Sequence, residues 1–215
     1  MSRILRDIPI EKQLAKHARW WEMQRAVRQQ PQAARTIPQL KPVICISRQH
    51  GSGGSEIARE VATQLDYQFC DRELLEAIAT RSRVRQELVA QFDEHVRGAL
   101  DTYLNNLFTG HIFDNTKYMH RLTQVVLGVA QYGSAVIVGR GANFIIAPER
   151  CLRVRIVAPL PERVAFVTDH YGSSCEQALC EVTRHDREQR AFIDHHFHRE
   201  IDDPLAYDLV VNTAA

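Results

Sequence analysis

The chain has 215 residues, of which 45% are apolar and 25% are charged, as in a globular protein with one large domain, or one domain and an appendage. No stretch approaches the length of a membrane span, and the N-terminus lacks the apolar region of a signal peptide. The five cysteines are scattered and contain no C-x-x-C pair. We therefore expect a cytoplasmic protein with reduced thiols. The net charge of +1 conceals a basic N-terminus, because residues 1–41 carry nine Lys or Arg against three Asp or Glu, and the remainder carries 18 against 23.

Residues 1–41 are predicted to form a basic helix and a linker. An apolar stripe that includes Leu14 and Trp21 runs among lysines and arginines, and the segment before the first strand is rich in Gln, Pro and Ala. A basic amphipathic helix can lie on a membrane or on nucleic acid. The large area of the pair Trp20 and Trp21 instead favours docking on the chain's own domain or on a partner subunit, as in a homo-oligomer. Nucleic acid is not the partner that we expect.

The stretch 42–65 combines a strand, a glycine turn and a helix. An apolar run at 43–46 leads into the turn, and apolar residues then recur with helical spacing. The turn consists of Gly51, Ser52, Gly53 and Gly54. Glycines allow a tight turn whose N–H groups point inward, and a helix N-terminus adds positive partial charge. The stretch therefore predicts a phosphate site, with a glycine-rich turn of an ordinary α/β domain as the alternative.

The turn departs from the P-loop pattern G-x-x-x-x-G-K-[ST]. Arg48 stands at the first glycine, Gly53 at the second, Gly54 at the lysine and Ser55 at the hydroxyl residue. The hydroxyl that binds Mg²⁺ in a P-loop is thus present, whereas the lysine that reaches the β- and γ-phosphates is absent. Because only four of the 27 basic residues are lysines, we expect phosphate chemistry here to depend on guanidinium groups, which bind phosphate in a bidentate manner.

A second strand is predicted at 67–70, and Asp71 follows it. The side chain of Asp71 can cap the next helix, or it can serve as a ligand group at the C-terminal end of a strand; the sequence leaves both interpretations open. Residues 73–132 are mostly helical by pattern, and a long helical insert between strands is typical of a lid or a substrate-binding subdomain.

Further strands are predicted at 135–138, 152–157 and 207–213, with a helix that starts near Pro161. The first of these strands ends in Gly-Arg-Gly, which places the guanidinium of Arg140 at the C-terminal edge of the sheet. This guanidinium lies beside the phosphate turn if the two strands are neighbours.

Residues 175–203 carry the densest charge. Arg184, Arg187 and Arg190 recur at intervals of three and share one face of a helix. Such a face can be a solvated surface with salt bridges, but three arginines without a carboxylate partner for each favour an anionic ligand.

Three histidines follow this helix face, namely His195, His196 and His198. Their spacing could bind a metal, but no cysteine stands at the spacing of a zinc site. A metal site at these histidines is therefore the less favoured interpretation.

Six segments, taken in order, match a known family. They are ISRQHGSGGSEIA at 46–58, FCDRELL at 69–75, VIVGRGANFI at 136–145, APLPERV at 158–164, DREQRAF at 186–192 and YDLVVNT at 207–213. Together they resemble the cytidylate kinase-like family of P-loop nucleoside monophosphate kinases over residues 42–213. The order and spacing of all six are far more specific than the glycine turn alone. The turn of that family also reads G-S-G-G, so the missing lysine is a family trait.

The resemblance implies an α/β fold of the P-loop NTPase type in residues 42–215. We expect a parallel sheet with helices on both faces, a helical nucleotide-monophosphate insert at 72–132 and an Arg-rich lid at 175–203. The implied activity is transfer of the γ-phosphoryl group of ATP, with Mg²⁺, to a nucleotide substrate, for which CMP or dCMP is expected.

The resemblance also implies roles for single residues. The backbone of residues 51–55 would hold the β-phosphate of ATP, Ser55 would meet Mg²⁺, and Arg48 would supply the charge that the lysine does not. Asp71 and Arg140 would contact the acceptor nucleotide. The arginines that would close over the transferring group are Arg184, Arg187 and Arg190.

Two other functions remain open from the sequence. One is a catalytically weak nucleotide-binding protein that senses a nucleotide and signals through its basic N-terminal arm. The other is a kinase that acts on a different small acceptor. We favour the kinase of a nucleoside monophosphate because lid arginines are not needed by a protein that only binds.

Overall fold

The computed structural model describes residues 9–28, 42–81, 88, 102 and 117–214. The helices are α1 (Ile10–Arg28), α2 (Gly54–Leu65), α3 (Arg72–Thr80), α6 (Lys117–Tyr132), α7 (Ala142–Ile145), α8 (Leu160–Tyr171) and α9 (Cys175–Phe197), with short 3₁₀ turns at Pro148–Arg150 and Pro204–Ala206. The strands are β1 (Val43–Arg48), β2 (Gln68–Cys70), β3 (Ala135–Val138), β4 (Cys151–Val157) and β5 (Leu209–Asn212). Each strand predicted from the sequence is confirmed to within two residues at either end.

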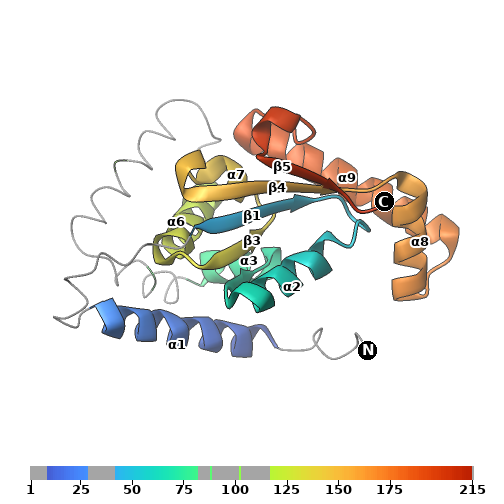
Figure 1. The fold of residues 1–215 in the computed structure, drawn as a ribbon. Coiled ribbons are helices and arrows are strands. Elements are labelled where there is room, and N and C mark those ends of the chain that lie inside the picture. Colours follow the sequence, from blue (N-terminus) through green and yellow to red (C-terminus); the bar gives the residue numbers. More distant parts are fainter. Residues whose placement is uncertain (1–8, 29–41, 82–87, 89–101, 103–116, 215) are drawn as a thin grey trace.

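The five strands form one parallel sheet in the order β2-β3-β1-β4-β5. The first strand of the chain therefore lies at the centre, and its two neighbours come from much later in the sequence (Figure 1). After β1, the chain forms β2 and β3 on one side of this strand and then crosses to form β4 and β5 on its other side. At such a switch point a parallel sheet opens a crevice at the C-terminal ends of its strands, and the turn after β1 lies there.

Helices cover both faces of the sheet, as predicted. Alternate residues of a strand point to opposite faces, so Val43 and Cys45 pack into a core with α3, α6, α7 and α9. Ile46 points the other way and packs against Ala58 and Ala62 of α2. The parallel sheet with helices on both faces is thus confirmed, with most of the described helices on one face.

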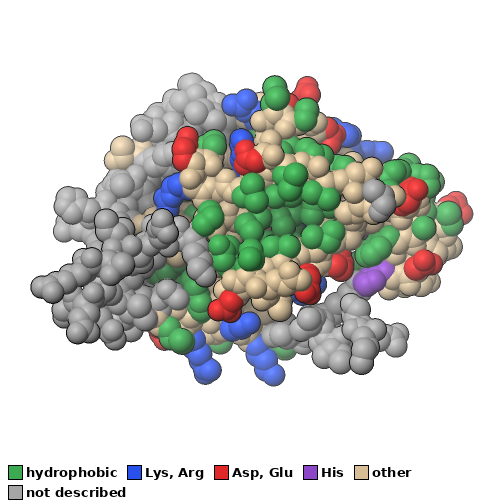
Figure 2. Space-filling view, viewed as in Figure 1, with side chains coloured by type: hydrophobic (Ala, Val, Ile, Leu, Met, Phe, Trp, Pro, Cys, Tyr) green, Lys and Arg blue, Asp and Glu red, His purple; other side chains and the backbone are tan. Residues whose placement is uncertain are grey.

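The face covered by α2 remains partly open among the described residues. Leu152 of β4 and Leu209 of the edge strand β5 are large apolar side chains with more than a third of their surface exposed. Figure 2 shows apolar side chains gathered over the middle of the molecule on this side. The protein therefore exposes an apolar area on the sheet, away from the C-terminal edge that carries the turn.

Helix α1 docks on the chain's own domain, as we expected from its tryptophans. Trp21 is only 2% exposed and its ring stacks on Tyr132 at a centroid distance of 6.2 Å. Leu14 joins the same core, and Glu11 forms a salt bridge of 2.9 Å with Arg81 at the end of α3. The predicted linker and the distal part of the basic arm, at 29–41 and 1–8, lie outside the described residues.

The predicted helical insert is described at its two ends. Helix α3 opens it and α6 closes it, and the two pack together through buried residues such as Leu75 and Leu122. The rest of the insert, apart from residues 88 and 102, lies outside the described residues.

Candidate functional site

The glycine turn joins the C-terminal end of the central strand to the first turn of α2. Gly51 and Gly53 adopt φ angles of +80° and +69°, in the left-handed region that favours glycine. Gly53 is the N-cap of α2 and offers no side-chain cap, so the first N–H groups of the helix remain available to an anion. The turn opens to solvent in a depression that Phe166 and Tyr171 of α8 also line. The predicted phosphate cradle thus has the expected backbone geometry.

Two glycines of the turn are required by close approach of other atoms. A Cβ at Gly51 would lie 2.6 Å from the carbonyl oxygen of Arg163 in α8, and a Cβ at Gly54 would lie 2.6 Å from the Cβ of Arg48. Real Cβ atoms do not approach other atoms this closely. The residue at the position of the P-loop lysine therefore has to be glycine here because Arg48 packs against it.

The two serines of the turn have different partners. The hydroxyl of Ser52 is buried and donates to the carbonyl oxygen of Gln49 at 2.8 Å, while its own carbonyl oxygen accepts from Thr213 at 2.9 Å. The hydroxyl of Ser55 accepts a hydrogen bond from Nε of Arg48 at 3.2 Å. Ser52 therefore braces the turn, and Ser55 places its oxygen beside a guanidinium in the open depression.

Arg48, Arg72 and Arg140 carry guanidinium groups near the C-terminal edge of the sheet. Burial and then the charges of Arg72 and Arg48 lower the pKa of Arg140 to about 10. Burial, followed by the charge of Arg72, also lowers the pKa of Arg48. Among the described salt bridges, Arg72 and Arg140 share the single carboxylate of Glu76. A bound anion would add negative charge beside these arginines, so the arginine cluster favours a phosphate ligand.

Arg140, predicted at the end of β3, lies at this edge of the sheet, and its backbone adopts an unusual conformation. Arg140 has φ +54° between two glycines that also have positive φ. Its guanidinium forms a salt bridge with Glu76 of α3 and lies 4.7 Å above the ring of Phe192 of α9. Arg140 thus contacts both α3 and α9.

The structure confirms one of the two interpretations of Asp71. Its carboxylate caps α3 by accepting from the N–H of Leu74 at 2.9 Å, which confirms the capping interpretation. Its charge also raises the pKa of Arg48, so the carboxylate lies close enough to the turn to act on it. A direct contact of Asp71 with a substrate stays a prediction.

The three arginines predicted for the lid lie on α9 but do not line the depression above the turn. Arg184 pairs with Glu188 at 2.7 Å and Arg190 pairs with Asp202 at 2.9 Å. Arg187 is exposed and forms no salt bridge with any residue that the structure describes. Of α9, Gln189 borders the depression. A role of these arginines in closure over a phosphoryl group stays a prediction and requires movement of their side chains.

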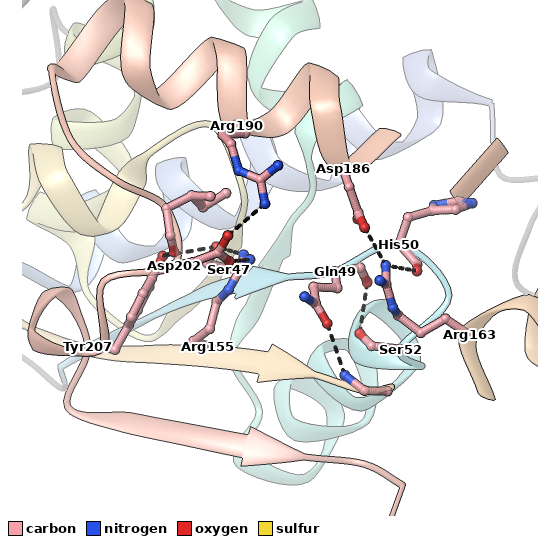
Figure 3. Close-up of polar contacts among 12 residues, drawn as sticks. Ser47, Gln49, His50, Ser52, Arg155, Arg163, Asp186, Arg190, Asp202 and Tyr207 are labelled. Atoms are coloured by element: carbon pink, nitrogen blue, oxygen red, sulfur yellow. Dashed lines mark hydrogen bonds and ion pairs between the residues drawn. The ribbon is translucent and has the colours of Figure 1, made fainter. Parts of the chain in front are cut away.

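A contact that the sequence did not indicate holds α9 beside the turn. Arg163 of α8 is buried and donates to the carboxylate of Asp186 at 2.7 Å and to the backbone carbonyl of His50 at 3.3 Å (Figure 3). One guanidinium therefore joins α8, α9 and the phosphate turn. The available signal was an arginine on the apolar face of α8 beside Val164 and Val167.

A second buried arginine was also missed. Arg155 of β4 donates to the hydroxyl of Ser47 and to the carboxylate of Asp202, at 2.8 Å each, and Asp202 also accepts from Arg190 (Figure 3). Arg155 occupies what reads as an apolar strand, so only the fold shows that its partners come from the segment after α9.

The histidines near the end of α9 do not form the metal cluster that their spacing could have built. His196 packs against Phe192 at 4.6 Å and Tyr118 at 6.4 Å, and His195 contacts His196. Within the described part of the chain, no three His, Cys, Asp or Glu side chains that include these residues converge. The less favoured interpretation of this segment is thus not supported.

None of the helices among the described residues is both long enough and apolar enough to span a membrane.

A model of the cytidylate kinase-like family matches residues 43–215. A cytidylate kinase of Ignicoccus hospitalis is 27% identical over 172 residues, which are 80% of this chain and 90% of that protein. The crystal structure of an uncharacterized protein from Eubacterium ventriosum superposes with a TM-score of 0.54 at 17% identity, covering 80% of this chain and 88% of that one.

Proposed function

Because the chain belongs to the cytidylate kinase-like family, we propose that it transfers the γ-phosphoryl group of ATP to a nucleoside monophosphate, with CMP or dCMP as acceptor. The observation that carries the proposal is the position of the arginine cluster. Burial and the positive charge of Arg72 lower the pKa of both Arg48 and Arg140, which lie beside a glycine turn with free helix N–H groups. Two phosphorylated ligands that meet at this edge would add negative charge beside these arginines, of which Arg72 and Arg140 share the one carboxylate of Glu76.

The turn would bind the phosphates of the donor. Backbone N–H groups of residues 51–55 would hold the β-phosphate, and Arg48 would add the positive charge that a P-loop takes from lysine. The Ser55 hydroxyl fits Mg²⁺, because Arg48 uses one of its two lone pairs and Mg²⁺ takes its remaining ligands from phosphates and water. When bound, the ion would neutralise charge on the phosphate oxygens.

The acceptor would bind on the side of Arg140 and Asp71. Phosphoryl transfer needs little covalent assistance from the protein, so catalysis would consist of alignment and of charge neutralisation on the equatorial oxygens. Arg140 must exchange Glu76 for the acceptor phosphate. Of the lid arginines, Arg187 could approach the phosphates without breaking a salt bridge to another described residue.

The proposal is tested by a coupled assay of ADP release with ATP, Mg²⁺ and each common ribo- and deoxyribonucleoside monophosphate in turn. We expect turnover with a pyrimidine monophosphate, and a loss of at least about 100-fold in Arg140→Ala, since removal of one transition-state donor has this effect in other enzymes. Arg150→Ala is the matched control, because this exposed arginine precedes β4 at the opposite edge of the sheet. Folded protein that binds ATP but releases no ADP with any acceptor would contradict the proposal.

The alternatives predict different outcomes of the same assay. A nucleotide sensor would bind ATP without turnover and would lose a partner when residues 1–35 are removed. The docking of α1 through Trp21 leaves Lys12 and Lys16 exposed for such a partner. A kinase of another small acceptor would release ADP only with that acceptor.

A further inference from the structure

Three side chains with metal-ligating atoms converge between the phosphate turn and α9. They are His50 from the turn, and Glu181 and His185 from α9. One potential ligand atom of each lies within 4.8 Å of one from each of the others. The closest pair is Nε2 of His50 and Oε1 of Glu181, at 3.0 Å, and the two imidazole rings lie 4.3 Å apart between centroids.

The proposed phosphate site takes its ligand groups from the backbone of the turn and from Arg48 rather than from these three side chains, although His50 also borders the depression. The backbone carbonyl of His50 accepts from Arg163, but its ring points to α9. Glu181 and His185 are four residues apart, which places both on one face of the helix, directed at the same point. All three side chains are partly buried, with exposed fractions of 22% for His50, 34% for Glu181 and 25% for His185.

We propose that His50, Glu181 and His185 form a binding site for a divalent transition metal, with Zn²⁺ as the representative ion, that joins the phosphate turn to α9. Two imidazoles and one carboxylate are a donor set that suits Zn²⁺. Bond lengths of about 2.0–2.2 Å place the ligand atoms of a tetrahedral zinc ion about 3.3–3.6 Å apart. The ligand atoms of the three side chains, which lie within 4.8 Å of one another, reach this spacing when the side chains rotate. Water would occupy the fourth ligand position.

Charged side chains next to the three residues influence the affinity for a metal ion. Arg184 approaches Nε2 of His185 at 3.2 Å and Glu188 approaches its Nδ1 at 3.6 Å. Arg184 is mostly exposed and already pairs with Glu188, so it can withdraw from His185 when a metal binds. The carboxylate of Glu181 partly balances the positive charge that the metal brings, because Asp186 and Glu188 already pair with Arg163 and Arg184.

A metal at this point would have a structural consequence that Arg163 alone does not produce. It would tie the helix that carries the lid arginines directly to residue 50 of the turn, and it would thereby restrict the position of α9. The site is separate from Ser55, and the inference does not depend on phosphoryl transfer to any acceptor.

The experiment is a titration of the full chain, stripped with EDTA, with Zn²⁺ by calorimetry and with Co²⁺ by visible absorption, both without nucleotide. We expect one ion per chain, d–d bands typical of nitrogen and oxygen ligands for Co²⁺, and a Zn²⁺-dependent rise in the thermal midpoint. His50→Gln, Glu181→Gln and His185→Gln should each weaken binding at least about tenfold, because even indirect support of metal ligands contributes 10–100-fold.

Two matched controls test other sources of binding. The double variant His195→Gln with His198→Gln removes two exposed histidines at the C-terminal end of α9, away from Glu181 and His185. The double variant Cys175→Ser with Cys180→Ser removes the exposed thiols of α9. Both should bind Zn²⁺ as the unmodified chain does. The inference is overturned if no stoichiometric binding occurs, if binding survives the three ligand substitutions, or if a control variant loses it. In the first case His50 and Glu181 form only a hydrogen-bonded pair.

Discussion

An alanine at Gly51 should destabilise the protein more than an alanine at another glycine of similar backbone conformation. Gly51 has φ +80°, and a Cβ there would lie 2.6 Å from the carbonyl oxygen and 3.1 Å from the carbonyl carbon of Arg163. Because these are backbone atoms of α8, no side-chain rotation can relieve the contact. Gly172, at the end of α8, has φ +70°, but a Cβ there would meet no atom within 4 Å.

The two variants therefore separate the backbone effect from the steric one. The left-handed conformation disfavours alanine by about 1–2 kcal/mol, and both variants incur this cost. Overpacking against atoms that cannot move adds about 1–3 kcal/mol at Gly51. For a chain of this size, 1 kcal/mol corresponds to a shift of roughly 2–4 °C in the thermal midpoint. Gly172→Ala should thus lower the midpoint modestly, and Gly51→Ala should lower it clearly more.

The assay is urea and thermal unfolding followed by circular dichroism, with ATP affinity measured at a temperature where both variants are folded. We expect Gly51→Ala to lose affinity as well, since relief of the contact must shift the turn that presents the N–H groups. Equal destabilisation by the two substitutions would refute the steric argument, and would show that the turn and α8 can separate freely.

Three further predictions concern the docked helix and the contact beside the turn. Trp21→Ala should lower the free energy of unfolding, measured by urea denaturation, by about 3–5 kcal/mol. The control Met23→Ala should change it by less than about 0.5 kcal/mol, because the side chain of Met23 is 66% exposed. Burial lowers the pKa of His17 from 6.5 to about 4. The stability that neutral His17 allows should therefore be full above pH 6.5 and should fall by about 3 kcal/mol between pH 6.5 and pH 4, because in this range His17 is protonated mainly in the unfolded chain. Both tryptophans lie on α1, so tryptophan fluorescence reports detachment of this helix as the pH falls. The variant His17→Gln should reduce the pH dependence of stability. Asp186→Asn should cost about 1–3 kcal/mol in urea denaturation, because it deprives the buried Arg163 of its anionic partner.

The strands, the helices that follow them and the conformation of the glycine turn at 51–54 could be predicted from the sequence, because local rules decide them. Apolar runs such as 135–138 are buried on both faces of a parallel sheet and so read as continuous. The turn needs glycine for its backbone conformation, and Asp71 caps a helix through an atom three residues away. These features depend on neighbours along the chain, which the sequence displays directly.

The partners of the charged residues were decided only by the tertiary structure. Arg163 and Asp186 are 23 residues apart and Arg155 and Ser47 are 108 residues apart, and neither spacing has a periodicity that marks a contact. The same holds for His50, whose ring meets α9 across 131 residues, while the conspicuous histidine run at 195–198 forms no cluster. Burial makes an unpaired charge costly, so each buried arginine must find a carboxylate or hydroxyl. Which one it finds depends on how the sheet order brings β1, β4, α8 and α9 to a common edge.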